Sequence, residues 1–122
     1  MTSEAAADRS APDRWSVCVT YFPFTDRELG KRRPVLVLTA SGFHEHSGHA
    51  ICAMITSGLS SVWPLDVAIG DLGAAGLQRP CVIRAKIFTI PLDHLRGTVG
   101  LLGQADAQAL TRTWAGLLPW GA

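Results

Sequence analysis

Basic side chains gather in two short stretches of this sequence, and both could bind phosphate. Residues 24–34 hold four basic and two acidic residues, and residues 72–92 hold three basic residues and no acid. The stretches carry +2 and +3 although the whole chain carries only +1, so the remainder is acidic. A fold that joined them would form a positive cleft for a phosphate-bearing ligand; the alternative is two separate solvated clusters. The basic residues are Arg27, Lys31, Arg32, Arg33, Arg79, Arg84 and Lys86.

Three histidines between Ser41 and His49 (SGFHEHSGH) raise the question of a metal site, because His-x-His is a known spacing of metal ligands. Glu45 is the one acid within this stretch. We therefore favour a polar, solvated loop and expect no metal at His44, His46 or His49.

The three cysteines are widely spaced, and none belongs to a CxxC pair. This spacing indicates neither a disulfide framework nor a zinc ribbon. Each cysteine lies in an apolar run, where a free thiol behaves as a small hydrophobic residue. Free thiols are typical of a reducing cytoplasm. The residues are Cys18, Cys52 and Cys81.

Short runs of β-branched and apolar residues predict the strands that would position these side chains. A region punctuated by glycines follows, and then Gln104–Leu118, where Leu110 and Trp114 recur at helical spacing. Five or six strands followed by one helix predict a small, partly open antiparallel barrel or an α+β domain, not a doubly wound sheet. The predicted strands are Ser16–Phe22, Pro34–Thr39, Ala50–Thr56, Pro64–Ile69 and Cys81–Ile90, with one helical turn between Gly70 and Pro80.

The last predicted strand carries two of the basic residues. Its alternation places Arg84 and Lys86 on one face together with Val82 and Phe88. Cations flanked by apolar residues on a strand are unusual for a plain solvated edge, so this pair favours a functional interpretation. The tryptophans Trp63, Trp114 and Trp120 are interpreted as core or interface residues.

The composition excludes several classes of protein. The chain has 122 residues, of which 48% are hydrophobic and 17% charged, which excludes an intrinsically disordered protein. No apolar run is long enough to cross a membrane. The near-neutral charge argues against a protein that coats nucleic acid. We expect a disordered tail over residues 1–13 and one domain over residues 14–122, with surplus apolar surface at an interface.

Four segments, in their order and spacing, resemble the MazF/PemK-like toxins, which are the ribonuclease members of bacterial type II toxin–antitoxin systems. The resemblance extends from about Trp15 to Leu118. It rests on FPFTD (Phe22–Asp26), KRRPVLVLT (Lys31–Thr39), ITS (Ile55–Ser57) and CVIRAKIFTI (Cys81–Ile90).

The resemblance implies a mainly β fold: a small SH3-like barrel of the CcdB/MazF type with a C-terminal helix, usually forming a homodimer. It implies cleavage of single-stranded RNA in the cytoplasm without metal or other cofactor. It also implies a cognate antitoxin that lays a disordered segment across the toxin dimer.

The resemblance also implies roles for particular residues. The family's functional arginine and threonine correspond to Arg33 and Thr56, its loop acid to Glu28, and a strand arginine of the Kid-like branch to Arg84. Metal-free cleavage needs a base for the ribose 2′-OH, donors for the phosphate and an acid for the leaving oxygen. We assign Glu28 as the base, and Arg33 and Thr56 as phosphate donors. Further RNA contacts are expected from Ser57, Arg84, Lys86, Arg27, Lys31 and Arg32.

Three positions depart from the family pattern. Trp15-Ser16 stands where members commonly have Gly-Asp or Gly-Glu, Arg27 stands where the Kid-like branch has a histidine, and Lys86 where it has an aspartate. These departures keep two alternatives open. One is an SH3-like binding module of the same family without catalytic activity, and the other is a relative that poisons DNA gyrase.

Overall fold

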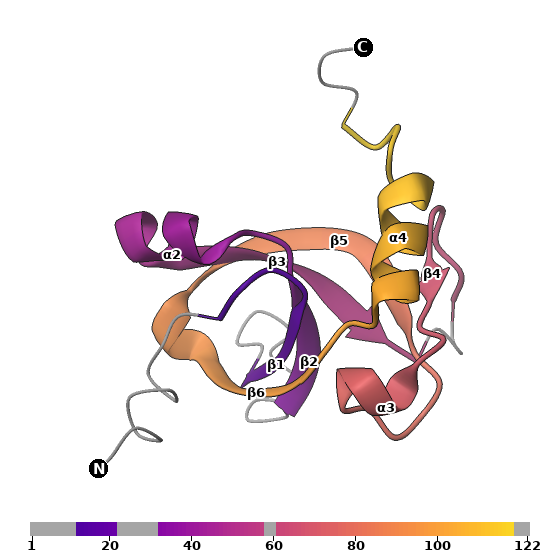
Figure 1. Ribbon diagram of the computed structural model, residues 1–122, viewed down its shortest axis with the longest axis horizontal. Coiled ribbons are helices and arrows are strands. Elements are labelled where there is room, and N and C mark those ends of the chain that lie inside the picture. Colours follow the sequence, from indigo (N-terminus) through magenta and orange to yellow (C-terminus); the bar gives the residue numbers. More distant parts are fainter. Residues whose placement is uncertain (1–11, 22–31, 58–60, 119–122) are drawn as a thin grey trace.

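A curled antiparallel sheet forms the body of the protein (Figure 1). The computed structural model describes residues 12–21, 32–57 and 61–118 of the chain. Within them, six strands are ordered β4-β5-β3-β2-β1-β6, and every neighbouring pair is antiparallel. The strands are β1 Ser16–Tyr21, β2 Arg32–Val37, β3 His49–Thr56, β4 Val67–Ala68, β5 Val82–Pro91 and β6 Leu95–Leu101.

The sheet buries apolar side chains on both faces, because successive residues of a strand point to opposite sides. One core lies where helices α3 (Leu72–Ala75) and α4 (Gln104–Thr113) pack on the sheet. It contains Val17, Leu36, Ala53, Ile55, Val67, Ile69, Ala75, Ile83, Leu102, Ala107 and Leu110. The second core, on the other face, contains Cys18, Val35, Val37, Ala50, Cys52 and Ile90. The predicted mainly β fold with a C-terminal helix is confirmed.

The prediction of a solvated loop over residues 41–49 is wrong. Ser41–Ser47 form helix α2, which ends at Gly48 in a left-handed conformation (φ 72°). His44 is fully buried, its Nδ1 donates to the Pro12 carbonyl at 2.7 Å, and its Nε2 lies 2.7 Å from the Thr39 hydroxyl. The helix escaped prediction because its one large apolar residue, Phe43, gives no helical periodicity. His44 therefore ties the N-terminal segment to the domain.

Two other elements differ from their predicted extent. The strand predicted over Pro64–Ile69 is only two residues long, because Trp63–Asp66 form a turn in which Leu65 has a positive φ of 66°. The glycine-punctuated region contains the short 3-10 helix η2 (Leu92–His94) and then β6. Most residues of β6 are exposed, so the alternation that reveals a half-buried strand is missing there.

Polar contacts join α4 to the residues before α3, and α3 in turn approaches the sheet closely. Asp106 of α4 is 8% exposed and accepts backbone N–H groups from Gly70 at 2.8 Å and Asp71 at 2.9 Å. Helix α3 approaches β6 so closely that a Cβ on Gly100 would lie 2.3 Å from the backbone of Ala75. Helix α4 ends at Thr113, five residues before the predicted end at Leu118.

Part of the predicted N-terminal tail lies in the described region. Asp13 Oδ1 accepts the backbone N–H groups of Arg14 and Ser41, and these bonds lower the pKa of the Asp13 carboxyl. Residues 1–11 of that tail lie outside the described residues. Within the described residues, no helix is long and apolar enough to cross a membrane.

Candidate functional site

Strand pairing places the main candidate residues on one face of the sheet. Val35 of β2 pairs with Met54 of β3, and Met54 pairs with Arg84 of β5. Paired residues share a face, as do residues two positions apart on a strand. Arg33 precedes Val35 by two positions and Thr56 follows Met54 by two. Arg33, Thr56 and Arg84 therefore lie on the face that carries the second core; we call this the arginine face.

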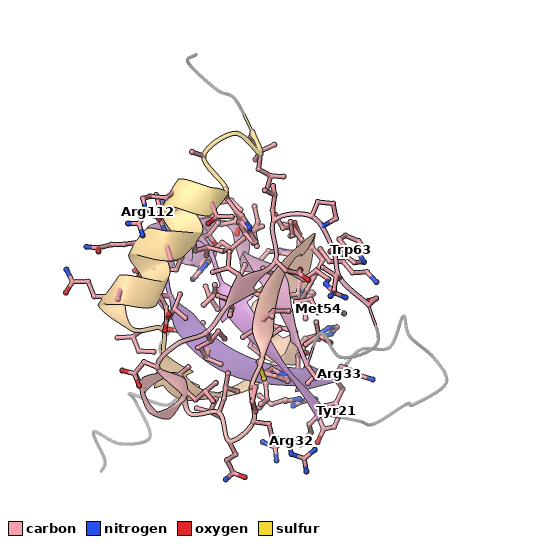
Figure 2. All side chains as sticks on the ribbon, turned by 90° about the vertical axis from the view of Figure 1, so that its right-hand side faces the viewer. Tyr21, Arg32, Arg33, Met54, Trp63 and Arg112 are labelled. Carbon is pink, nitrogen blue, oxygen red and sulfur yellow. The ribbon has the colours of Figure 1, made fainter. Side chains whose placement is uncertain are left out.

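Arg33 lies near the N-terminal end of β2. It is half-buried, and it pairs across the strands with Thr20, which is fully buried and donates to the His94 carbonyl at 2.7 Å. Arg32 and its partner Tyr21 are exposed. Figure 2 shows Tyr21, Arg32 and Arg33 at the same end of the sheet, with Met54 and Trp63 further along. Arg32 and Arg33 are consecutive in β2, so their side chains leave opposite faces of the sheet at this end.

Arg84, further along the same face, forms an ion pair with a carboxylate. Its Nε and one terminal nitrogen donate to the two oxygens of Asp66 at 3.1 and 2.9 Å, a bidentate pair. It also donates to the hydroxyl and the carbonyl of Ser61 at 3.2 and 3.1 Å. The residue is only 7% exposed. These hydrogen bonds lower the pKa of the Asp66 carboxyl and raise the pKa of the Arg84 guanidinium.

Trp63 projects from the turn that Arg84 holds. The Arg84 guanidinium lies 5.4 Å from the centre of its ring and the Lys86 ammonium 5.8 Å from it. Ala85 and Lys86 form a bulge in β5. Ala53 of β3 pairs with Ile87, but the next residue, Met54, pairs with Arg84, so two residues of β5 lie between these pairs. Bulges commonly re-aim side chains next to functional sites. The exposed Lys86 ammonium is thereby brought beside the indole.

The remaining sequence predictions divide into three groups. Thr56 is half-buried and Ser57 exposed, directly after one another at the end of β3. Arg79 is exposed between α3 and β5. Glu28, Arg27 and Lys31 lie outside the described residues, so the assignment of Glu28 as the base stays a prediction.

The positive cleft expected from the charge pattern stays a prediction, because Arg27 and Lys31 lie outside the described residues. Of the cations on or beside the arginine face, Arg84 is matched by Asp66, whereas Arg32 and Lys86 are exposed. The sequence reasoning missed Asp66, which stands in a segment interpreted as a strand. Trp63, interpreted as a core or interface residue, is 39% exposed and so is not a core residue of the single chain. No local signal in the sequence pairs residues 66 and 84.

Neither thiol nor metal chemistry is built into the described part of the chain. Cys18 and Cys52 are buried and Cys81 is partly buried, and all three are free thiols. Burial raises the pKa of each thiol, to about 12 for Cys52, so none is a reactive thiolate at neutral pH. No group of three or more His, Cys, Asp or Glu side chains in the described residues could hold a metal ion.

Comparison with known proteins identifies a family and a fold. The profile of the family described as "PemK-like, MazF-like toxin of type II toxin-antitoxin system" matches residues 13–117. No curated protein matches the chain. Several solved structures share the fold at low sequence identity.

Three of these structures show the similarity. The MazE-MazF structure (Form-II) from Deinococcus radiodurans has a TM-score of 0.68 at 18% identity, over 88% of this chain and 95% of that chain. An endoribonuclease in complex with its cognate antitoxin from Mycobacterial species has a TM-score of 0.67 at 22% identity, over 89% and 94%. Mycobacterium tuberculosis toxin MazF-mt6 has a TM-score of 0.67 at 23% identity, over 85% and 96%.

Proposed function

The chain belongs to the PemK-like, MazF-like toxins of type II toxin–antitoxin systems, and we propose that it is a metal-independent endoribonuclease that cleaves single-stranded RNA. One observation carries the proposal: the strand register brings Arg33 and Thr56 onto one face, at adjacent ends of β2 and β3. A guanidinium and a hydroxyl so placed can both donate to the same phosphate group.

The proposed reaction is attack by the ribose 2′-oxygen on the adjacent phosphorus. A base removes the 2′-proton, the new P–O bond forms, the P–O5′ bond breaks, and an acid protonates the leaving 5′-oxygen. The products are a 2′,3′-cyclic phosphate and a 5′-hydroxyl. Arg33 stabilises the additional charge on the phosphorane, because a guanidinium stays charged and can bind two phosphate oxygens at once. Thr56 donates a further hydrogen bond, assisted by the adjacent Ser57.

Proton transfer is assigned to residues on the rim of this face. Glu28 is the proposed base. Lys86 is the candidate acid on β5, since its ammonium is exposed beside Trp63. Arg84 serves as a positioning residue, because the hydrogen bonds to Asp66 and Ser61 already occupy most of its N–H groups. Arg32, with Arg27 and Lys31, would contact flanking phosphates.

The proposed partners are a second copy of this chain and a cognate antitoxin, in the cytoplasm. Similar solved structures include MazE-MazF pairs and an endoribonuclease with its cognate antitoxin. Exposed apolar side chains supply contact area for such partners: Ile87 lies on β5, and Leu118 follows the C-terminal helix. Residues 14–122 would form the single folded domain of each subunit.

The direct test is cleavage of a mixed-sequence single-stranded RNA by the purified protein in EDTA. The wild type should cleave it and leave 5′-hydroxyl ends, which RNA end mapping detects. Arg33→Ala should lose most of this activity. Arg33→Lys, which keeps the charge but cannot bind two phosphate oxygens in the bidentate geometry of a guanidinium, should retain part of it. Undiminished cleavage by Arg33→Ala would refute the assignment.

A second candidate is an RNA-binding module that does not cleave. Two observations favour it: Asp66 neutralises Arg84, and Lys86 stands at the position where the Kid-like branch has an aspartate. Such a module would bind the same RNA in EDTA but leave it intact. The cleavage assay therefore separates the two candidates. No described residue specifically favours gyrase poisoning.

A further inference from the structure

An exposed indole stands at the end of the arginine face with cations beside it. Trp63 is 39% exposed, and Arg84 and Lys86 lie 5.4 and 5.8 Å from its ring centre. A tryptophan ring attracts nearby cations, and unpaired nucleobases stack on the same kind of surface. Lys86 keeps an exposed ammonium, which can bind a phosphate of the same nucleic-acid strand.

The turn that carries Trp63 is fixed before any ligand binds. Asp66 accepts the backbone N–H of Trp63 at 3.0 Å as well as both Arg84 donors. On the other side, the Trp114 indole N–H donates to the Leu65 carbonyl at 2.9 Å. Leu65 has a left-handed backbone (φ 66°), which costs energy for a residue with a side chain and persists where neighbouring contacts enforce it. Preorganised ring platforms lose little entropy on binding.

A shallow apolar pocket adjoins this ring. It has a volume of about 570 Å³ and is lined mainly by the same turn. That size lies within the range of small-ligand sites. Its lining residues are Val62, Trp63, Pro64, Leu65, Ala85 and Leu117.

We propose that Trp63 and Lys86 form a nucleobase-binding subsite, in which an unpaired base near the cleaved phosphate stacks on the indole. This inference rests on the proposed function and adds a substrate-binding residue to it. Continuing the register across β2, β3 and β5 places the Cα atoms of Arg33 and Arg84 ~12 Å apart, from typical strand spacing and rise. A short stretch of single strand can span that distance, with a phosphate at Arg33 and a base on Trp63.

The experiment measures binding separately from cleavage. The probe is a fluorescein-labelled 12-nucleotide RNA of mixed sequence with 2′-O-methyl groups throughout, which blocks the attacking oxygen. Its affinity is measured by anisotropy at several salt concentrations. Trp63→Ala should weaken binding by about 10- to 100-fold, as expected for a lost base stack. Trp63→Phe keeps an aromatic face and should stay within about threefold of the wild type. Trp63→Leu keeps apolar bulk without a π face and should resemble Trp63→Ala.

The controls distinguish stacking from charge and from folding. Phe43→Ala removes an aromatic of similar exposure (43%) on α2 and should bind like the wild type. Trp63→Ala should keep the wild-type salt dependence, whereas Arg33→Ala should reduce its slope by about one phosphate contact. Unfolding curves confirm that each variant is folded.

The outcomes separate this proposal from the cleavage proposal. If the wild type binds the probe through Trp63 but cleaves no RNA, the endoribonuclease assignment fails and the subsite stands. If the wild type cleaves RNA and Trp63→Leu binds the probe as tightly as the wild type, the subsite is refuted. A lower mass in solution for Trp63→Ala with unchanged probe affinity would also refute it, by assigning the ring to a subunit interface.

Discussion

Arg33 and Arg84 lie on the same face of the sheet, but their surroundings differ. Arg33 is half-buried near the N-terminal end of β2, next to the exposed Arg32. Arg84 is 7% exposed and gives its donors to Asp66 and Ser61. From the sequence, both arginines were expected to offer a positive charge to a phosphate-bearing ligand, each from one of the two basic stretches. The difference teaches that the charge count along a chain overstates the charge that a ligand can reach.

The largest expected effect comes from Arg33 itself. Arg33→Ala should lower kcat for RNA cleavage by about 10²- to 10³-fold, the usual loss when a donor to developing charge is removed. The change should lower thermal stability less than Arg84→Ala does, because Arg33 is half-buried whereas Arg84 is only 7% exposed. Single-turnover kinetics and thermal unfolding measure the two quantities. A large fall in stability would make Arg33 a structural residue and remove the contrast with Arg84.

A smaller effect on cleavage is expected at Arg84. Arg84→Ala should lower the rate by about tenfold, because it misplaces the Trp63 turn and removes no group proposed to touch the phosphate. It should also lower the melting temperature, since Asp66 and Ser61 lose their partner. The matched variant Arg84→Lys keeps the charge without the bidentate geometry and should restore little stability. Equal rate losses for Arg33→Ala and Arg84→Ala would contradict the distinction between them.

A site on the opposite face supplies a reference for pure stability effects. Asp106→Ala leaves two N–H groups, those of Gly70 and Asp71, without their acceptor. It should lower the free energy of unfolding by about 1–3 kcal/mol without changing cleavage per folded molecule. Chemical denaturation and active-site-normalised kinetics measure both. If the folded variant lost activity, the contacts of Asp106 would also affect the residues of the arginine face.

The smallest effect concerns the pH dependence of the Arg84–Asp66 pair. The pKa of Asp66 is lowered in the folded protein, so the pair stabilises the fold at pH values above the carboxyl's unfolded pKa of about 3.9. This stabilisation is lost as the pH falls from there through the folded pKa. Asp66→Asn should therefore lower stability at neutral pH and flatten the acid limb of the stability curve. An unchanged acid limb would mean that the pair contributes nothing to stability.

Much of the fold followed from local patterns, and the exceptions have identifiable causes. Strands β1, β2, β3 and β5 were predicted within about two residues, because each is a run of β-branched or apolar residues. Helix α2 was missed because its buried residue is His44, whose burial depends on Pro12 and Thr39. The length of the strand at Pro64–Ile69 was overestimated because the turn around Leu65 is imposed by Trp114 and Asp66.

The candidate site was predictable in its residue types but not in its arrangement. Arg33 and Thr56 could be selected by resemblance. The alternation of β5 correctly placed Arg84 on the face of Phe88, which pairs with Cys52 and packs on the second core. Nothing in the sequence was a reason to choose Asp66 as a site residue or to expect an exposed Trp63. Both depend on how the turn before β4 folds back over β5.

The sequence by itself determined which strands form, which side of each strand is apolar, and the family to which the chain belongs. The strands and their apolar sides are local properties, because side-chain periodicity and β-propensity act over a few residues. The family follows from short motifs in their order and spacing. The tertiary structure alone decided that Arg84 pairs with Asp66 and that Trp63 is exposed. Asp66 and Arg84 are 18 positions apart, and their contact exists only because β4 pairs with β5 and Leu65 accepts a strained conformation.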